Sequence, residues 1–159
     1  AIEFSQKKNC SIAIVEPNTS NPSINKTFHT RVSAITPSSE AYLKSLNIWN
    51  DIKRKQVFVA TKVWDQNSHG RLNFHAKDEN MEYLGYIIEN DLIQSALFSG
   101  IDKNKIKLIN AKLSGLKKTD SGYEVNLDNQ ASLSCRLLVG ADGANSQVRT
   151  LSAIEVNER

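Results

Sequence analysis

The sequence predicts an α/β fold, because stretches typical of buried strands alternate with amphipathic helices. The nearly continuous apolar run Ser11–Glu16 is typical of a central parallel strand that is buried on both faces. Helix starts are indicated by capping residues, Thr36 followed by Pro37 in one case and Asn90 in the other. From Val57 the apolar period changes to that of strands.

The remaining elements follow from the same patterns. Residues 1–8 resemble the last two turns of a helix, and residues 17–30, rich in Asn, Ser, Thr and Pro, indicate a long loop. We expect helices at residues 36–47 and 90–99, and strands at residues 57–64, 71–75, 83–88, 106–109, 111–116, 123–127 and 132–139. The first two of these β segments, 57–64 and 71–75, favour a β-hairpin with a longer loop, and 83–88 adds a third strand.

Composition excludes several classes of function. With 159 residues and 40% hydrophobic content, the chain suffices for one domain or for one and a half small lobes. The net charge of +3 comes from interspersed charges, so we expect no nucleic-acid partner, and the basic run at 53–55 indicates a solvated element end. No apolar run reaches the roughly 18 residues of a membrane span. We therefore expect a cytoplasmic protein, at most peripheral to a membrane.

The segment 137–149 carries the strongest candidate site. An apolar stretch runs into Gly-Ala-Asp-Gly-Ala-Asn-Ser at 140–146, where small residues let the backbone approach a ligand closely. Asp142 is placed to accept hydrogen bonds from ligand hydroxyls, and Arg149 to contact phosphate or to hold the turn. A tight strand-to-helix turn with a capping Asp explains the same residue types equally well.

Glu16 is the second candidate, because it closes a predicted parallel strand. A carboxylate there can accept two hydrogen bonds from the hydroxyls of an adenosine ribose. The alternative is an ordinary solvated strand end, and the residue type does not decide between them. The three histidines lie scattered in the sequence, so we expect neither a metal site nor a catalytic triad.

Taken in order and spacing, these motifs resemble those of the ubiquinone-biosynthesis hydroxylases, which are class A FAD-dependent aromatic monooxygenases similar to para-hydroxybenzoate hydroxylase. The resemblance covers nearly the whole chain, and its ordered set of motifs is more specific than any one of them. The segments that carry it are Ala13–Pro17, Arg31–Ile35 with Ser39, Leu46–Trp49, Leu84–Asn90 and Gly140–Ser146 with Arg149.

The resemblance implies a partial FAD-binding domain of the Rossmann-like, glutathione-reductase type with an inserted β-sheet segment of a substrate domain. Residues 1–52 would form the first part of the FAD-binding domain, residues 53–89 the substrate-domain strands, and residues 90–159 the second part. The seven glycines form no G-x-G-x-x-G motif. We therefore expect the phosphate loop and the C-terminal part of the family to lie outside this sequence, and the 159-residue chain to be inactive alone.

The resemblance also implies roles for residues in the flavin site. Glu16 would bind the adenosine ribose, and the backbone near Ala111 would face the adenine. Asp142 and Gly143 would hold the ribitol and pyrophosphate, with Arg149 nearby.

Two further residues complete the implied site. Arg31 would reach the pyrophosphate or the isoalloxazine region from the loop before its helix. Asn90 would contact the flavin side, although a helix-capping role is almost as well supported by its position.

The implied activity of the parent protein is hydroxylation of an aromatic ring with FAD, NAD(P)H and O2. The substrate would be a polyprenyl phenol or quinol precursor, which suggests peripheral contact with the inner membrane or a ubiquinone-biosynthesis complex. No catalytic side chain is expected, because the cofactor carries the oxygen chemistry. Two alternatives remain: a flavin hydroxylase of a soluble aromatic, and a non-catalytic scaffold or binding remnant in a biosynthetic complex.

Overall fold

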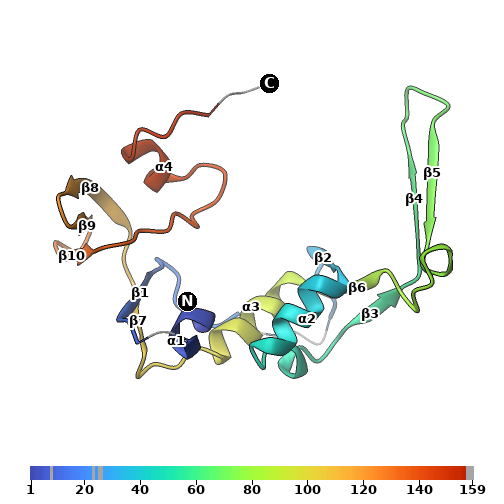
Figure 1. Ribbon diagram of the computed structural model, residues 1–159, viewed down its shortest axis with the longest axis horizontal. Helices are drawn as coiled ribbons and strands as arrows, with labels where there is room; N and C mark the ends of the chain where they lie inside the picture. The colour runs from blue at the N-terminus through green and yellow to red at the C-terminus, as the bar shows by residue number, and fades with distance from the viewer. Residues whose placement is uncertain (8, 23, 25–26, 157–159) are drawn as a thin grey trace. The chain divides into compact units, whose positions relative to one another are not determined.

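The computed structural model describes residues 1–7, 9–22, 24 and 27–156. The chain divides into two compact units, each built from two stretches of sequence (Figure 1). Unit 1 comprises Ala1–Cys10 and Ser20–Asp102, and unit 2 comprises Ser11–Thr19 and Lys103–Arg159. Helices and strands occur in both units, which confirms the α/β class. The functional division at residues 52 and 89 stays a prediction.

Unit 1 is built on a three-stranded antiparallel sheet in the order β2–β6–β3. Strand β6 (Gly85–Glu89) lies in the middle and pairs with β2 (Val32–Ile35) on one side and with β3 (Gln56–Phe58) on the other. Ile88 of β6 is 1% exposed, so the central strand contributes directly to the core. Helix α3 (Asn90–Ser99) begins immediately after β6, where Glu89 occupies the N-cap position.

Helix α2 (Pro37–Ser45) begins as the sequence predicts. The Thr36 hydroxyl accepts a hydrogen bond from the backbone N–H of Ser39 at 3.4 Å, and Pro37 occupies the first turn. The short helix α1 (Ile2–Lys7) agrees with the predicted helix end, except that residue 8 lies outside the described residues. The described part of unit 1 also contains two short 3-10 helices, at Trp49–Asp51 and Ala76–Glu79.

A buried carboxylate links α2 to the segment before β6. Glu40 is 3% exposed, and it accepts a hydrogen bond from the Tyr83 hydroxyl at 2.9 Å and pairs with Lys44 Nζ at 2.7 Å. The hydrogen bond to Glu40 raises the pKa of Tyr83 to about 12. Two polar partners therefore compensate the desolvation of this carboxylate.

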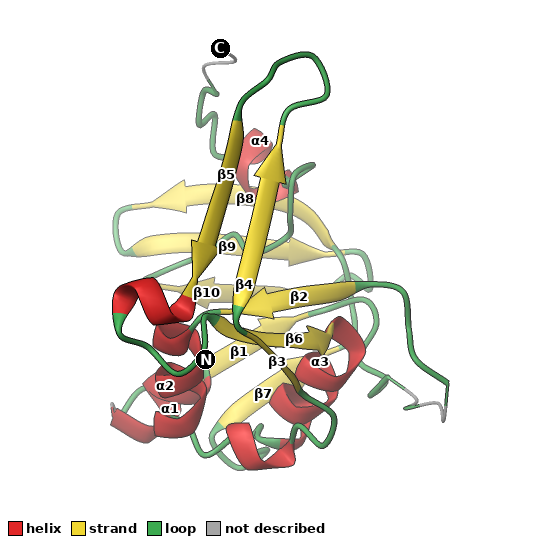
Figure 2. Cartoon of the chain, turned by 90° about the vertical axis from the view of Figure 1, so that its right-hand side faces the viewer, coloured by secondary structure: helices red, strands yellow, loops and turns green. Residues whose placement is uncertain are grey.

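The strand predicted at residues 57–64 is divided between two sheets. Its first part is β3, whereas β4 (Ala60–Trp64) pairs with β5 (Arg71–His75) in a two-stranded hairpin that extends away from α2 and α3 (Figure 2). At the break, the Val59 carbonyl accepts a hydrogen bond from the Ala76 N–H at 2.9 Å. Periodicity alone cannot reveal such a break, because the apolar pattern continues through it.

Unit 2 contains a parallel pair and an antiparallel meander. Strands β1 (Ile12–Val15) and β7 (Ile106–Ile109) are parallel, as predicted, with Ile12 opposite Ile106. The expectation that β1 is buried on both faces is wrong, since Ala13 is exposed and β7 is the one strand that pairs with β1 in the described part of the chain.

The meander of unit 2 has the order β10–β9–β8. Its strands are β8 (Leu113–Thr119), β9 (Gly122–Leu127) and β10 (Ser132–Cys135), and the short helix α4 (Gln147–Leu151) follows. The core of this unit is a cluster formed by Ala111, Val125 and Leu127, against which Val15 and Ile109 from the parallel pair also pack.

The strand predicted over residues 132–139 ends earlier than expected. It stops at Cys135, and Leu137 and Val139 are 68% and 69% exposed. An apolar run becomes a strand only where its backbone pairs with a neighbour, and residues 136–139 have no such pairing in the structure described. The predicted loop at 17–30 includes residues 23, 25 and 26, which lie outside the described residues.

Among the residues that the structure describes, no helix combines the length and the apolar character needed to cross a bilayer.

We predict that Gly85→Ala destabilises the protein by about 2–4 kcal/mol. Gly85 has φ +156°, and a Cβ at this position would lie 2.3 Å from the Ile35 carbonyl oxygen. Urea unfolding followed by circular dichroism measures the change. Gly70→Ala is the matched control, because its Cβ would meet only Ser68 Oγ at 3.3 Å. Equal stability of the two variants would contradict the prediction, because it would mean that β2 and β6 can move apart at Gly85 without loss of stability.

Candidate flavin site

Glu16 lies at the carboxyl end of β1, where its backbone continues the parallel ladder. The Glu16 N–H donates to the Ile109 carbonyl at 3.0 Å, and its Oε1 accepts a hydrogen bond from the Asn18 N–H at 2.9 Å. The side chain is half-buried. A carboxylate in this position is oriented by the strand end and by the turn that follows it.

The carboxyl end of β7 lies beside that of β1, because parallel strands end at the same edge. Asn110, one residue beyond β7, donates from Nδ2 to Thr19 Oγ1 at 3.3 Å. Ala111 follows and is 5% exposed, with its methyl group in the core cluster of unit 2. Any ligand contact at Ala111 would therefore come from its backbone, as the resemblance implies.

The segment 140–146 forms a turn held by Asp142. One carboxylate oxygen, Oδ1, accepts the hydroxyl of Ser146, and the other, Oδ2, accepts the N–H of Val148 at 3.2 Å. The Ser146 hydroxyl also accepts from the Arg149 N–H at 3.0 Å, which caps α4. The hydrogen bond from Ser146 holds the pKa of Asp142 below its ordinary value. The capping-turn interpretation thus accounts for both carboxylate oxygens, and a cofactor role for Asp142 stays a prediction.

Gly143 leaves the outer side of this turn open. Its φ is +84°, in the left-handed region that favours glycine, and no heavy atom lies within 4 Å of the position that a Cβ would take. A ligand can therefore approach the backbone here without meeting a side chain. Arg149 lies in α4 and is half-buried.

Arg31 and Asn90 are brought together in unit 1. The Asn90 N–H donates to the Arg31 carbonyl at 3.1 Å, and Asn90 Oδ1 accepts the hydroxyl of Ser33 at 2.6 Å. Asn90 is not the helix cap, since Glu89 takes that position. The Arg31 side chain is exposed, so its guanidinium is accessible to an anionic ligand.

Glu89 and Arg54 form a partly buried ion pair that the sequence pattern did not reveal, in which the Arg54 side chain stays 29% exposed. Glu89 is 6% exposed; Arg54 Nη2 donates to its Oε1 at 3.1 Å, and Arg54 Nε lies 3.0 Å from its Oε2. The interpretation of residues 53–55 as a solvated end is therefore wrong for Arg54. A usable signal was present: an acid closes an otherwise apolar strand, and such a buried charge requires a counter-charge.

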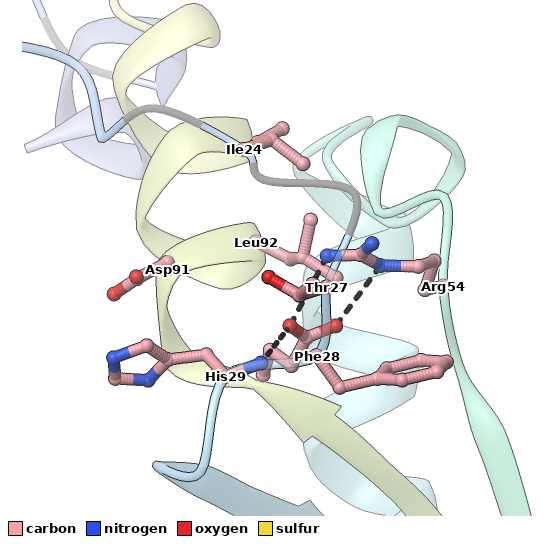
Figure 3. A pocket seen from close by; sticks show the side chains of 8 residues that line it. Ile24, Thr27, Phe28, His29, Arg54, Asp91 and Leu92 are labelled. Carbon is pink, nitrogen blue, oxygen red and sulfur yellow. Dashed lines mark hydrogen bonds and ion pairs between the residues drawn. The ribbon is translucent and has the colours of Figure 1, made fainter.

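This pair lines a small pocket in unit 1, about 40 Å³ in volume (Figure 3). Phe28 lies under the Arg54 guanidinium, 5.3 Å from it to the ring centroid, and the His29 N–H donates to Glu89 Oε1 at 2.7 Å. The pocket holds little more than a water molecule. It therefore organises the loop before β2 and does not suit a cofactor.

Within unit 2, the end of β1 and the stem of the 140–146 turn share one hydrophobic cluster. Val15, which precedes Glu16, and Leu138, which precedes Gly140, both pack against the cluster of Ala111, Val125 and Leu127. The described residues include no group of three or more His, Cys, Asp or Glu side chains placed to hold a metal ion.

Two solved structures with a similar fold are described as flavin-dependent monooxygenases. PqsL of Pseudomonas aeruginosa, described as a probable FAD-dependent monooxygenase, matches with a TM-score of 0.65 and 17% identity over 99% of this chain and 43% of its own. The flavin-dependent monooxygenase PieE, solved with FAD and substrate, matches with a TM-score of 0.67 and 12% identity over 99% of this chain and 30% of its own. The fold is thus that of a segment of FAD-dependent monooxygenases.

Among monooxygenases, the sequence relatives of the chain include enzymes named for ubiquinone biosynthesis. The chain is 31% identical to 3-demethoxyubiquinol 3-hydroxylase of Escherichia coli strain K12 over 80% of its length and 33% of the relative. It is also 31% identical to mitochondrial ubiquinone biosynthesis monooxygenase COQ6 of Mus musculus over 97% of its length and 34% of the relative. No protein-family model matches the chain. The chain is a homologue of the ubiquinone-biosynthesis hydroxylases and spans about a third of their length.

We predict that Ser146→Ala raises the pKa of Asp142 toward its ordinary value of 3.8, because the variant removes the largest influence that lowers it. Since this pKa is lowered in the folded chain, the cap contributes stability above pH 3.8 and loses it as the pH falls through the folded value. NMR titration of the Asp142 carboxyl carbon measures the midpoint. Ser132→Ala, at a hydroxyl that bonds Glu124 instead, is the control. An unchanged midpoint in Ser146→Ala would contradict the assigned hydrogen bond.

Proposed function

We propose that this chain forms part of the FAD-binding region of a monooxygenase that hydroxylates an aromatic ring. The observation that carries the proposal is the homology to ubiquinone-biosynthesis monooxygenases over 80–97% of the chain. The arrangement of Glu16 at the β1 end and the open backbone of Gly143 supports it independently. The chain would supply binding groups, and FAD, when bound, would supply the oxygen chemistry.

Each proposed cofactor contact uses a group whose local geometry suits it. The Glu16 carboxylate would accept hydrogen bonds from the two ribose hydroxyls, since an ionised carboxylate has about four lone-pair sites and Asn18 uses one of them. The unhindered backbone at Gly143 would lie against the pyrophosphate or ribitol. The exposed Arg31 guanidinium would contact anionic oxygens of the cofactor.

For the substrate, we propose a polyprenyl phenol or quinol precursor of ubiquinone, with NAD(P)H as the reductant. The names of the relatives support the quinol class. The reductant is proposed from the resemblance of the 140–149 segment to the motif of the family. A hydroxylase of soluble aromatics remains the second enzymatic candidate. The names of the sequence relatives favour the hydroxylase of a ubiquinone precursor over a non-catalytic scaffold.

The test of the adenosine contact is Glu16→Gln. We expect this variant to weaken FAD binding at least about tenfold, because the amide oxygen replaces two charge-assisted hydrogen bonds with weaker ones. Fluorescence polarisation of the flavin, which reports weak binding, measures affinity. ADP contains the adenosine ribose that Glu16 is proposed to bind, whereas riboflavin lacks it, so the two ligands test the contact separately.

The matched control is Glu124→Gln, which removes an exposed strand carboxylate of the same unit. The pattern expected for Glu16→Gln is a loss for FAD and ADP with no loss for riboflavin. Equal affinity of wild type and Glu16→Gln for ADP would remove the adenosine assignment. Because we expect the phosphate loop to lie outside this sequence, these affinities are measured in the parent protein, and absence of flavin binding in every variant of it would contradict the proposed function.

We also propose peripheral contact of the β4–β5 hairpin with a membrane. Val63 and Leu72 form a cross-strand pair and are 49% and 60% exposed, while Trp64, at 69%, lies on the opposite face beside the paired Arg71. The hairpin strands contain Lys62 and no acidic residue. Apolar, aromatic and cationic side chains together are typical of an interfacial contact with anionic lipid.

We expect the emission of Trp64 to shift to shorter wavelength when vesicles containing phosphatidylglycerol are added. Trp64→Phe should abolish the shift, because the remaining Trp49 is buried. Uncharged phosphatidylcholine vesicles are the control and should bind more weakly. Failure of the wild-type protein to sediment with anionic vesicles would exclude this contact.

A further inference from the structure

Strand register places Arg54 opposite Glu89. Strands β3 and β6 are antiparallel with Gln56 opposite Ile87, so two residues before Gln56 and two residues after Ile87 meet across the sheet. On the other side of β6, Val32 is opposite Glu89. The end of β6 is therefore flanked by the extension of one neighbour and by the start of the other.

Glu89 and Asn90, at the end of β6 and the start of α3, form hydrogen bonds with three residues of the segment 29–33. Glu89 Oε1 accepts the His29 N–H at 2.7 Å, and the Asn90 N–H donates to the Arg31 carbonyl at 3.1 Å. The Ser33 hydroxyl donates to Asn90 Oδ1 at 2.6 Å. Two consecutive residues thus hold the beginning, the middle and the end of this segment.

The backbone of Arg31 is fixed on both sides while its side chain stays outside. Its N–H donates to His29 Nδ1 at 3.2 Å, and its carbonyl accepts from Asn90. The Arg31 side chain is exposed, so these backbone hydrogen bonds do not serve to bury it. A fixed backbone with an accessible guanidinium is the arrangement that favours ligand binding, because less freedom is lost when the ligand binds.

We propose that Glu89 and Asn90, with Arg54 as the counter-ion of Glu89, are positioning residues that hold Arg31 in place for the anionic part of its ligand. The buried Glu89 carboxylate accepts from His29 and from Arg54 at the same time (Figure 3). The guanidinium of Arg54 neutralises the charge and lets the carboxylate remain in the interior. The identity of the ligand as FAD rests on the proposed function.

The test removes the ion pair without leaving a buried charge. The double variant Glu89→Met with Arg54→Met replaces both side chains by apolar ones of similar length, which keeps the packing and removes the acceptor for His29. Lys77→Met with Glu82→Met, two exposed residues of unit 1, is the matched control for the same change in charge. Circular dichroism establishes that each variant is folded.

Two readouts separate positioning from general stability. Amide hydrogen exchange should become about tenfold faster or more at His29 and Arg31 in the double variant, with the β2–β6 ladder still protected. Affinity for FAD should fall about tenfold where Arg31 is present and by less than about twofold in an Arg31→Ala background. Glu89→Gln retains an acceptor oxygen for His29 and should show intermediate exchange.

Unchanged exchange at His29 in a folded double variant would overturn the proposal. Equal loss of FAD affinity with and without Arg31 would also overturn it, because the pair would then act on the whole unit. FAD affinity is measured in the parent protein; if the wild-type parent protein binds no FAD, the proposed function fails, and the exchange experiment still decides whether these residues hold Arg31. A variant that unfolds is replaced by Glu89→Gln, which is judged by the same exchange criterion.

Discussion

A buried carboxylate at the end of β6 constrains much of unit 1. Glu89 is 6% exposed, and burying an isolated charge of this kind costs several kcal/mol unless it is paired and hydrogen-bonded. The structure meets this requirement with Arg54 from the segment before β3 and the His29 N–H from the loop before β2. One charge thereby fixes two connections that are distant in the sequence, on either side of the central strand.

The candidate site residues are held by different interactions in the two units. In unit 2 the candidate groups lie at the ends of short elements, and a shared hydrophobic cluster sets the position of the strand end before Glu16 and of the stem before Gly140. In unit 1 the backbone of Arg31 is held by hydrogen bonds. Packing is tolerant of small displacements, whereas hydrogen bonds fix distance and direction, so the backbone of Arg31 is held more precisely than packing alone would hold it.

Local chemistry explains which parts of the fold could be predicted from the sequence. The start of α2 depends on Thr36 and Pro37, which are adjacent to the helix that they begin, and the parallel strand at 12–15 is marked by its own apolar run. The end of β10 and the division of the 57–64 strand were not predictable, because both depend on which distant strand supplies hydrogen bonds. In the same way, Glu16 and Asp142 carry recognisable motifs, whereas the Arg54–Glu89 pair depends on a register between residues 35 positions apart.

Asp142 illustrates how the same residue types support both a structural and a ligand-binding interpretation of a motif. Its two carboxylate oxygens accept from Ser146 and Val148, so the residue types that indicate a ligand turn are also those that close the turn. A carboxylate committed to capping orients the backbone between Gly140 and Ser146 and leaves Gly143 open to solvent. Gly143 therefore offers an unobstructed stretch of backbone, and the two capping hydrogen bonds leave part of the acceptor capacity of the exposed Asp142 carboxylate unused. In such a motif, the side chain that closes the turn also determines the course of the main chain between Gly140 and Ser146.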